Sequence, residues 1–107
     1  MKVRDTFTCP LELCFDVIKG KWKPIIIWRL RCGKTSPAQL QRDINGITQK
    51  MLLEQLKELA DAKMVDKIIY PGYPLRVEYF LTSRGEEILE ALKIMQKIGT
   101  ELLVDLK

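Results

Sequence analysis

The stretch of residues 36–60 constrains the fold more than any other part of the sequence, because it predicts two short helices joined by a tight turn. The first of these helices should begin at Ser36, which is a preferred N-cap residue. Pro37 suits the first helical position, and Gln39 completes an S-x-x-Q capping box. We expect this helix to end at about Ile44.

The second helix follows a break in the pattern at Asn45-Gly46, since both residues tolerate the left-handed conformation that ends a helix. Thr48 is its predicted N-cap, and Ile47 and Leu52 have the spacing of a hydrophobic staple. A helix, a glycine-containing turn and a second helix form the helix-turn-helix signature, in which the second helix enters the DNA major groove. An ordinary helical hairpin has the same pattern, so these residues alone leave both interpretations open.

The second helix, expected from Thr48 to Lys63, should divide into an apolar and a polar face. The residues predicted to face inward are Leu52, Leu53, Leu56, Leu59 and Ala60. Its start carries hydroxyl, amide and ammonium groups that suit base edges and phosphates. The candidate DNA-binding residues of the whole motif are Ser36, Thr48, Gln49, Lys50, Met51, Gln55 and Lys57. The far end is acidic, with Glu54, Glu58 and Asp61, and should face away from DNA.

Two runs with period-two alternation follow, residues 65–70 and 75–82, and they predict a β-hairpin over residues 65–82. The turn-rich segment 71–74 joins them. A helix-turn-helix followed directly by a hairpin is the order of a winged helix-turn-helix. Arg76 is therefore a candidate DNA contact in the wing, together with Tyr73 and Lys67. Tyr70 and Tyr73 could equally pack on the hairpin itself.

The last helix is predicted over residues 83–106, with Thr82 or Ser83 as its cap and Ser83-x-x-Glu86 as a capping box. Its apolar residues span about 200° of arc, whereas a helix that serves one small core needs only about 100°. The excess predicts a second partner, most economically another copy of the chain. The expected dimer interface comprises Leu89, Leu92, Met95, Leu102, Leu103 and Leu106.

The N-terminal third predicts two further helices. One should start at Cys9-Pro10 and end at Gly20, with one face of Leu11, Cys14, Phe15 and Ile18 packed inward. A basic turn, residues 19–23, should fold Trp22 inward. The apolar run from Pro24 to Leu30 predicts a buried helix that stops at Gly33.

Composition narrows the classes of function. The net charge is +4, and residues 1–47 hold nine basic against four acidic side chains, which suits a phosphate-facing surface as well as a solvated face. Three cysteines without a CxxC pair, and the absence of histidine, argue against a zinc site, a secreted disulfide framework and histidine-dependent catalysis. No apolar run approaches the roughly 18 residues of a membrane span. We expect a single cytoplasmic domain over residues 1–107, without cofactor or metal.

The chain resembles the HxlR-type family of bacterial winged helix-turn-helix regulators, relatives of the MarR group. The resemblance rests on C-P-L-E at residues 9–12, D-V-I-K-G-K-W-K at 16–23, G-I-T-Q-K-M-L at 46–52, L-K-E-L at 56–59 and P-L-R-V-E-Y-F-L-T-x-x-G at 74–85. It implies a mostly helical α+β fold, a winged helix-turn-helix with added N- and C-terminal dimerisation helices. It also implies a homodimeric transcription regulator, expected to be a repressor, that binds operator DNA.

In several members of this family, the cysteine of the N-terminal C-P motif senses oxidants or electrophiles, and Cys9 matches it. A helix N-terminus stabilises a thiolate, which agrees with that role, although Cys9 could simply pack or cap. We interpret Cys14 as a core residue and leave Cys32 open. Two other functions remain as alternatives, a protein-interaction adaptor that uses the acidic face and a thiol-based enzyme. A small-molecule effector is a further open alternative.

Overall fold

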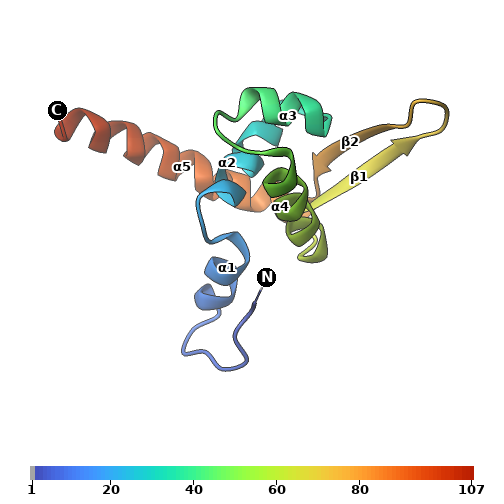
Figure 1. Cartoon of the computed structure of the whole chain (residues 1–107). Helices are drawn as coiled ribbons and strands as arrows, with labels where there is room; N and C mark the ends of the chain where they lie inside the picture. Colours follow the sequence, from blue (N-terminus) through green and yellow to red (C-terminus); the bar gives the residue numbers. More distant parts are fainter. Residues whose placement is uncertain (1) are drawn as a thin grey trace.

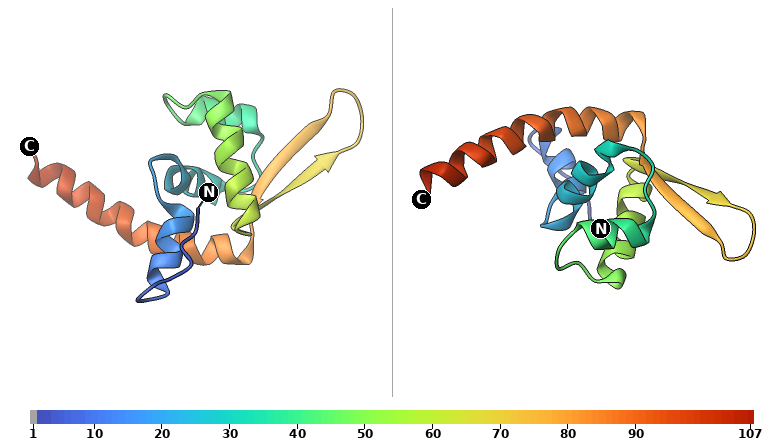
Figure 2. Two further views of the ribbon diagram at one scale, coloured as in Figure 1. Left: turned by 60° about the horizontal axis from the view of Figure 1, so that its bottom comes forward. Right: turned by 90° about the horizontal axis from the view of Figure 1, so that it is seen from above.

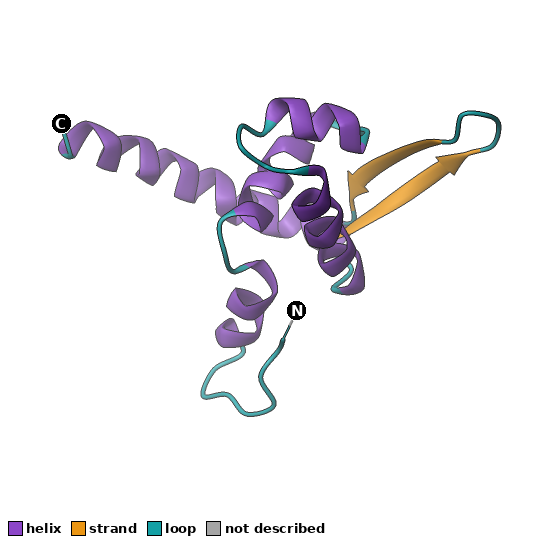
Figure 3. Ribbon diagram, in the orientation of Figure 1, coloured by secondary structure: helices purple, strands orange, loops and turns teal. Residues whose placement is uncertain are grey.

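The computed structural model describes residues 2–107, and it shows a helical body with a two-stranded wing on one side and a long helix projecting on the other (Figures 1 and 3). The molecule is flat, with extents of 48 × 39 × 24 Å. Along this part of the chain the elements are α1 Leu11–Ile18, α2 Trp22–Arg29, the 3₁₀ helix η1 Leu30–Cys32, α3 Pro37–Asp43, α4 Gln49–Asp61, β1 Val65–Tyr70, β2 Arg76–Leu81 and α5 Ser83–Asp105. None of these helices is long and apolar enough to cross a membrane.

The core lies between α2, α3, α4 and the first part of α5. Its fully buried side chains are Ile26, Ile27, Leu40, Leu52, Leu56 and Leu59. The run from Pro24 to Leu30 is therefore a buried helix, as predicted, and η1 continues it to a stop at Gly33, whose φ is 113°. Burial of this apolar surface is the main driving force for the fold.

Helix starts in the motif are fixed by the predicted caps. The hydroxyl of Ser36 accepts a hydrogen bond from the backbone N–H of Gln39 at 3.1 Å, and that of Thr48 accepts one from Met51 at 3.1 Å. The second half of the first capping box is absent, because the amide of Gln39 bonds Asp43 and Arg42 instead of the Ser36 backbone.

The cap of α5 is Thr82, whose hydroxyl accepts from the backbone N–H of Gly85 at 3.1 Å. Of the two predicted caps, Thr82 is therefore confirmed, and the predicted capping box of Ser83 and Glu86 is wrong. The same Thr82 hydroxyl donates to the carbonyl groups that precede β1, at Lys63 and Met64. This bridge between the end of α4 and the start of α5 favours Thr82 over Ser83 as the cap.

Several apolar residues predicted to face inward are exposed. On α4, Leu53 and Ala60 lie at the edges of the apolar arc and contribute to the surface. On α1, Leu11 and Phe15 are 61% and 55% exposed, although Ile18 is buried as expected. Helical periodicity correctly identifies which face of a helix is apolar. How much of that face is buried depends on the elements that pack against it.

The long helix α5 changes character along its length. Leu89 and Leu92 are buried in the core of their own chain, so these two residues of the predicted dimer interface are already occupied. Beyond them the helix extends away from the body in every view (Figures 1 and 2). The exposed apolar residues of this projecting part are Ile94, Met95, Ile98, Leu102, Leu103, Val104 and Leu106.

Candidate DNA-binding surface

The start of α4 forms the exposed tip of the helix-turn-helix. Thr48, Gln49 and Lys50 are exposed, while Met51 and Gln55 are half-buried. The buried leucines of α4 hold the opposite face against the core, so the polar side chains at its start point away from the protein. These groups can donate to base edges and phosphates.

The turn before α4 is shaped by Gly46, whose φ of 91° favours glycine. Trp22 lies against this turn, because a β-carbon on Gly46 would be 3.8 Å from its ring. Trp22 is half-buried and packs on the core, as the sequence predicted for it. Ile47 is buried directly before the Thr48 cap. The angle between α3 and α4 is therefore set by packing on both sides of the turn.

One buried ion pair anchors α4, the second helix of the helix-turn-helix, to α2. The ammonium of Lys23 donates to the carboxylate of Glu58 at 2.7 Å, with the two side chains 7% and 25% exposed. This hydrogen bond is the largest of the contributions that lower the pKa of Glu58 to about 2. Glu58 is thus a structural residue, and the exposed acidic face predicted for α4 is smaller than the sequence indicated.

The remaining candidate DNA contacts differ in their exposure to solvent. Ser36 is half-buried and its hydroxyl is used as a cap. Lys57 is exposed but lies more than two turns from the tip of α4, where it pairs with Asp61 at 3.4 Å. The structure therefore brings Gln49 and Lys50 together at the tip and leaves Lys57 at its side.

The wing is an antiparallel pair of strands in which Val65 faces Leu81 and Tyr70 faces Arg76. The guanidinium of Arg76 lies over the Tyr70 ring at 4.6 Å, and the Tyr70 hydroxyl donates to Glu78 at 2.8 Å. That hydrogen bond raises the pKa of Tyr70. Tyr70 therefore packs on the hairpin and positions Arg76, while Tyr73 is fully exposed at the tip.

A polar notch of about 490 Å³, which the sequence did not predict as a site, separates the helix-turn-helix from the wing. We call it the basic notch, since its cationic side chains are Arg29, Arg31 and Lys34. Its other lining residues are Cys32, Thr35, Ser36, Gln39, Asp43 and Glu78. The available signal in the sequence was the clustering of three basic residues within positions 29–34, shortly before Ser36.

Cys9 lies at the end of an N-terminal arm that is folded back on α1. Arg4 holds the arm through two guanidinium hydrogen bonds to Asp16, at 2.8 and 2.9 Å, and a third to Glu12. The other Glu12 oxygen accepts from the backbone N–H groups of Cys9 and Thr8. These bonds lower the pKa values of both carboxyl groups. Cys9 itself is exposed and its thiol is free.

The other two cysteines are also free thiols. Cys14 packs against the core, as predicted, whereas Cys32 is exposed beside the basic notch. Within residues 2–107 there is no group of three acidic or cysteine side chains that could hold a metal ion.

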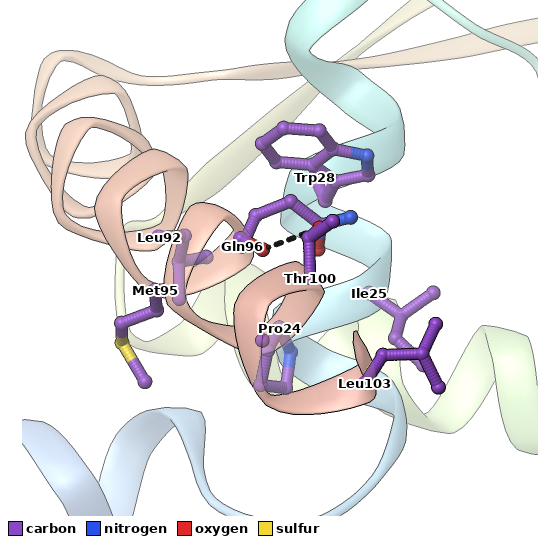
Figure 4. A pocket seen from close by; sticks show the side chains of 9 residues that line it. Pro24, Ile25, Trp28, Leu92, Met95, Gln96, Thr100 and Leu103 are labelled. Atoms are coloured by element: carbon purple, nitrogen blue, oxygen red, sulfur yellow. Dashed lines mark hydrogen bonds between the residues drawn. The ribbon is translucent and has the colours of Figure 1, made fainter. Parts of the chain in front are cut away.

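An apolar groove of about 360 Å³ runs between α2 and the exposed half of α5 (Figure 4). Trp28 and Ile25 line one wall, and Met95 and Leu103 line the other. At its centre Thr100 donates to the carbonyl of Gln96 at 3.0 Å, so the one hydroxyl there is satisfied within the helix. Of the predicted interface residues beyond Leu92, Met95 and Leu103 therefore line this groove, and Leu102 and Leu106 are exposed elsewhere on α5 and at its C-terminal end.

Comparison with known proteins agrees with this architecture. A family model described as HxlR-like helix-turn-helix matches residues 17–106. A protein of Fusobacterium mortiferum, provisionally named as the regulatory protein MalR, is 41% identical over 99 residues, which cover 92% of this chain and 93% of the relative.

Two solved structures have the same fold. The redox regulator HypR in its reduced form superimposes with a TM-score of 0.83 at 35% identity, covering 87% of this chain and 92% of HypR. The reduced form of the transcriptional regulator YodB from B. subtilis superimposes with a TM-score of 0.75 at 33% identity, covering 85% and 90%. The chain therefore belongs to the HxlR-like helix-turn-helix family and is a transcriptional regulator with a winged helix-turn-helix fold.

Proposed function

We propose that the protein binds operator DNA sequence-specifically as a homodimer and represses transcription by occupying the promoter. The observation that carries this proposal is the exposed start of α4, where Gln49 and Lys50 project from a helix whose other face is fixed in the core. Residues 48–51 enter the major groove, and Gln55 borders this reading surface. Arg76, positioned by Tyr70, contacts the backbone next to the wing.

Fluorescence anisotropy with a duplex from upstream of the protein's own gene tests sequence-specific binding. Gln49→Ala and Lys50→Ala should each weaken operator binding by roughly 1–3 kcal/mol. Lys97→Ala, which removes an equally exposed charge from the far half of α5, is the control and should leave affinity unchanged. Wild-type affinity in both α4 variants would contradict the assignment of this surface.

The homodimer is supported by the exposed apolar half of α5 and by the groove between α5 and α2. Met95, Leu102, Leu103 and Leu106 are all more than half exposed, and the exposed Phe15 of α1 adds to the unpartnered apolar surface. Sedimentation equilibrium should give a dimer mass for the wild type. Leu102→Asp should give a monomer, whereas Ile69→Asp, at an equally exposed apolar position on the wing, should remain dimeric. A wild-type monomer at micromolar concentration would refute this part.

Cys9 is proposed as an oxidant sensor, because its thiol is exposed and its backbone belongs to the network that folds the arm on α1. Peroxide converts such a thiol to sulfenic acid with release of water. Peroxide should lower operator affinity of the wild type and of Cys32→Ser but not of Cys9→Ser. If the Cys9→Ser variant were as sensitive to peroxide as the wild type, Cys9 would not be the sensor.

The alternative functions have less support. An adaptor that uses the acidic face of α4 loses Glu58 to the pair with Lys23. A thiol enzyme acting through Cys9 would need a partner base, and the sequence contains no histidine. We therefore propose a non-enzymatic cytoplasmic regulator. The apolar groove in Figure 4 is large enough for a small effector, which makes effector binding a secondary proposal.

A further inference from the structure

The basic notch lies at the junction between the two DNA-binding elements of the chain. The loop that carries Lys34 is fixed to the base of the wing, because the backbone of Thr35 exchanges two hydrogen bonds with Tyr79 of β2, at 2.9 and 2.8 Å. The Thr35 hydroxyl also donates to the carbonyl of Gly33 at 2.9 Å. The views in Figures 1 and 2 agree that the start of α3 lies beside β2.

The cations of the notch are placed to bind an anion from outside the chain. The guanidinium of Arg31 is held over the Trp28 ring at 4.2 Å, with one N–H donated to the Trp28 carbonyl at 2.9 Å, and its other donors remain available. Throughout the described chain, the side chains of Arg29 and Lys34 have no hydrogen-bond or ion-pair partner, and they lie at the protein surface.

The two acids of the notch only partly offset these three cations. One oxygen of Asp43 accepts from the Gln39 amide at 2.8 Å, and one oxygen of Glu78 accepts from the Tyr70 hydroxyl. Within residues 2–107, neither carboxylate pairs with a notch cation. The notch therefore keeps a net positive charge, and its cationic side chains come from the end of α2, from η1 and from the loop before α3.

We propose that the basic notch binds neighbouring backbone phosphates of one DNA strand through Arg29, Arg31 and Lys34. This inference rests on the proposed function, in which α4 enters the major groove and the wing lies at the adjacent minor groove. Neighbouring grooves of a duplex are separated by one sugar-phosphate strand, and that strand crosses the protein between α4 and the wing. The notch is lined by residues of α3 and β2, so a strand held there would be fixed in register on the protein without any reading of sequence.

The test measures the salt dependence of binding on two duplexes, one from upstream of the protein's own gene and one scrambled to the same composition. Removal of one phosphate-binding cation makes the slope of log affinity against log salt less negative by about 0.9. In the triple variant Arg29→Gln/Arg31→Gln/Lys34→Gln, the slope should change by two to three such units, and by roughly equal amounts on both duplexes. Arg29→Lys/Lys34→Arg should keep the wild-type slope.

Two controls separate the notch from other effects. Lys93→Gln/Lys97→Gln/Lys107→Gln removes the same charge from α5 and its end, and it should change the slope by less than one unit. Because Arg31 packs on Trp28, the double variant Arg29→Gln/Lys34→Gln is measured alongside the triple variant. Its slope should change by about two units while its unfolding temperature stays at the wild-type value.

The outcomes distinguish a failure of the phosphate site from a failure of the proposed DNA-binding function. A wild-type slope in the notch variants, with reduced affinity in Lys50→Ala, would overturn the phosphate site and leave the proposed function intact. An effect confined to the native duplex would overturn it as well, because it would show base reading. Failure of the wild type to bind either duplex would overturn both proposals.

Discussion

The ammonium of Lys23 lies 2.7 Å from the carboxylate of Glu58, and this contact joins two helices through residues 35 positions apart in the chain. Lys23 is buried on α2 and Glu58 lies in the second half of α4. A charge pair in this position tolerates little rearrangement, because removal of one partner leaves the other poorly solvated. The pair therefore fixes α4 on the helical body.

Glu58→Ala should destabilise the fold by about 1.5–3 kcal/mol, since it removes a charge-assisted hydrogen bond from a buried ammonium. Lys23→Met/Glu58→Ala should recover part of that stability, because the methionine needs no counter-charge. Lys57→Ala/Asp61→Ala removes an exposed pair of the same helix and should cost less than about 1 kcal/mol. Urea unfolding followed by circular dichroism measures all three; a double variant less stable than Glu58→Ala would contradict this account.

The free energy of unfolding should also depend on pH in the acidic range. The pKa of Glu58 in the folded chain is lowered to about 2 from 4.5, so the unfolded chain binds more protons between these values. The contribution of the Lys23–Glu58 pair to the free energy of unfolding is complete above pH 4.5 and is lost as the pH falls through 2. Asp16, with its pKa lowered by Arg4, acts in the same direction. The slope of unfolding free energy against pH below 4.5 should be shallower in Glu58→Gln than in the wild type; an identical slope would exclude Glu58 as its source.

Gly85→Ala should lower the unfolding temperature by several degrees. A β-carbon at this position would lie 2.1 Å from the backbone carbonyl oxygen of Met64, so α5 would have to move away from the start of β1. Gly99→Ala on the same helix meets nothing within 4 Å and should stabilise the helix by up to about 1 kcal/mol. Differential scanning calorimetry compares the two. Equal unfolding temperatures would show that the junction is not closely packed.

Arg4→Ala should release the N-terminal arm, because the guanidinium bonds Asp16 and Glu12 together. Alkylation of Cys9 by iodoacetamide, followed by peptide mass spectrometry, should become several-fold faster than in the wild type. Lys2→Ala removes an exposed charge from the same arm and should leave the rate unchanged. A rate unaffected by Arg4→Ala would mean that the folded arm does not control the reactivity of Cys9.

The sequence predicted the local features of the fold well, because each depends on a few adjacent residues. Ser36 and Thr48 cap their helices through the next residues in the chain, and the alternation of Val77, Tyr79 and Leu81 defines the inward face of β2. The sequence left Thr82 and Ser83 as alternative caps of α5, and the choice of Thr82 depends on the distant carbonyl groups of residues 63 and 64.

Features that depend on distant residues were missed or only partly predicted. The partners in the Lys23–Glu58 and Arg4–Asp16 pairs are 35 and 12 positions apart, and no local pattern links them. Periodicity could not tell that Leu89 packs within its own chain while Leu102, on the same helix, does not. The basic notch arises because the backbone of the loop before α3 pairs with β2, which brings basic residues to the wing.

The junction at Met64 has a mechanical consequence for a dimer built on α5. This helix is packed tightly at Gly85 and extends freely beyond Leu92, so it can act as a lever between the wing and the partner. Its 23 residues span about 34 Å, so a tilt of roughly 5° at the packed end would displace the far end by about 3 Å. Half-sites on DNA recur at a fixed helical repeat. A small change of angle at this junction would therefore move the two α4 helices of such a dimer away from the spacing of the two half-sites.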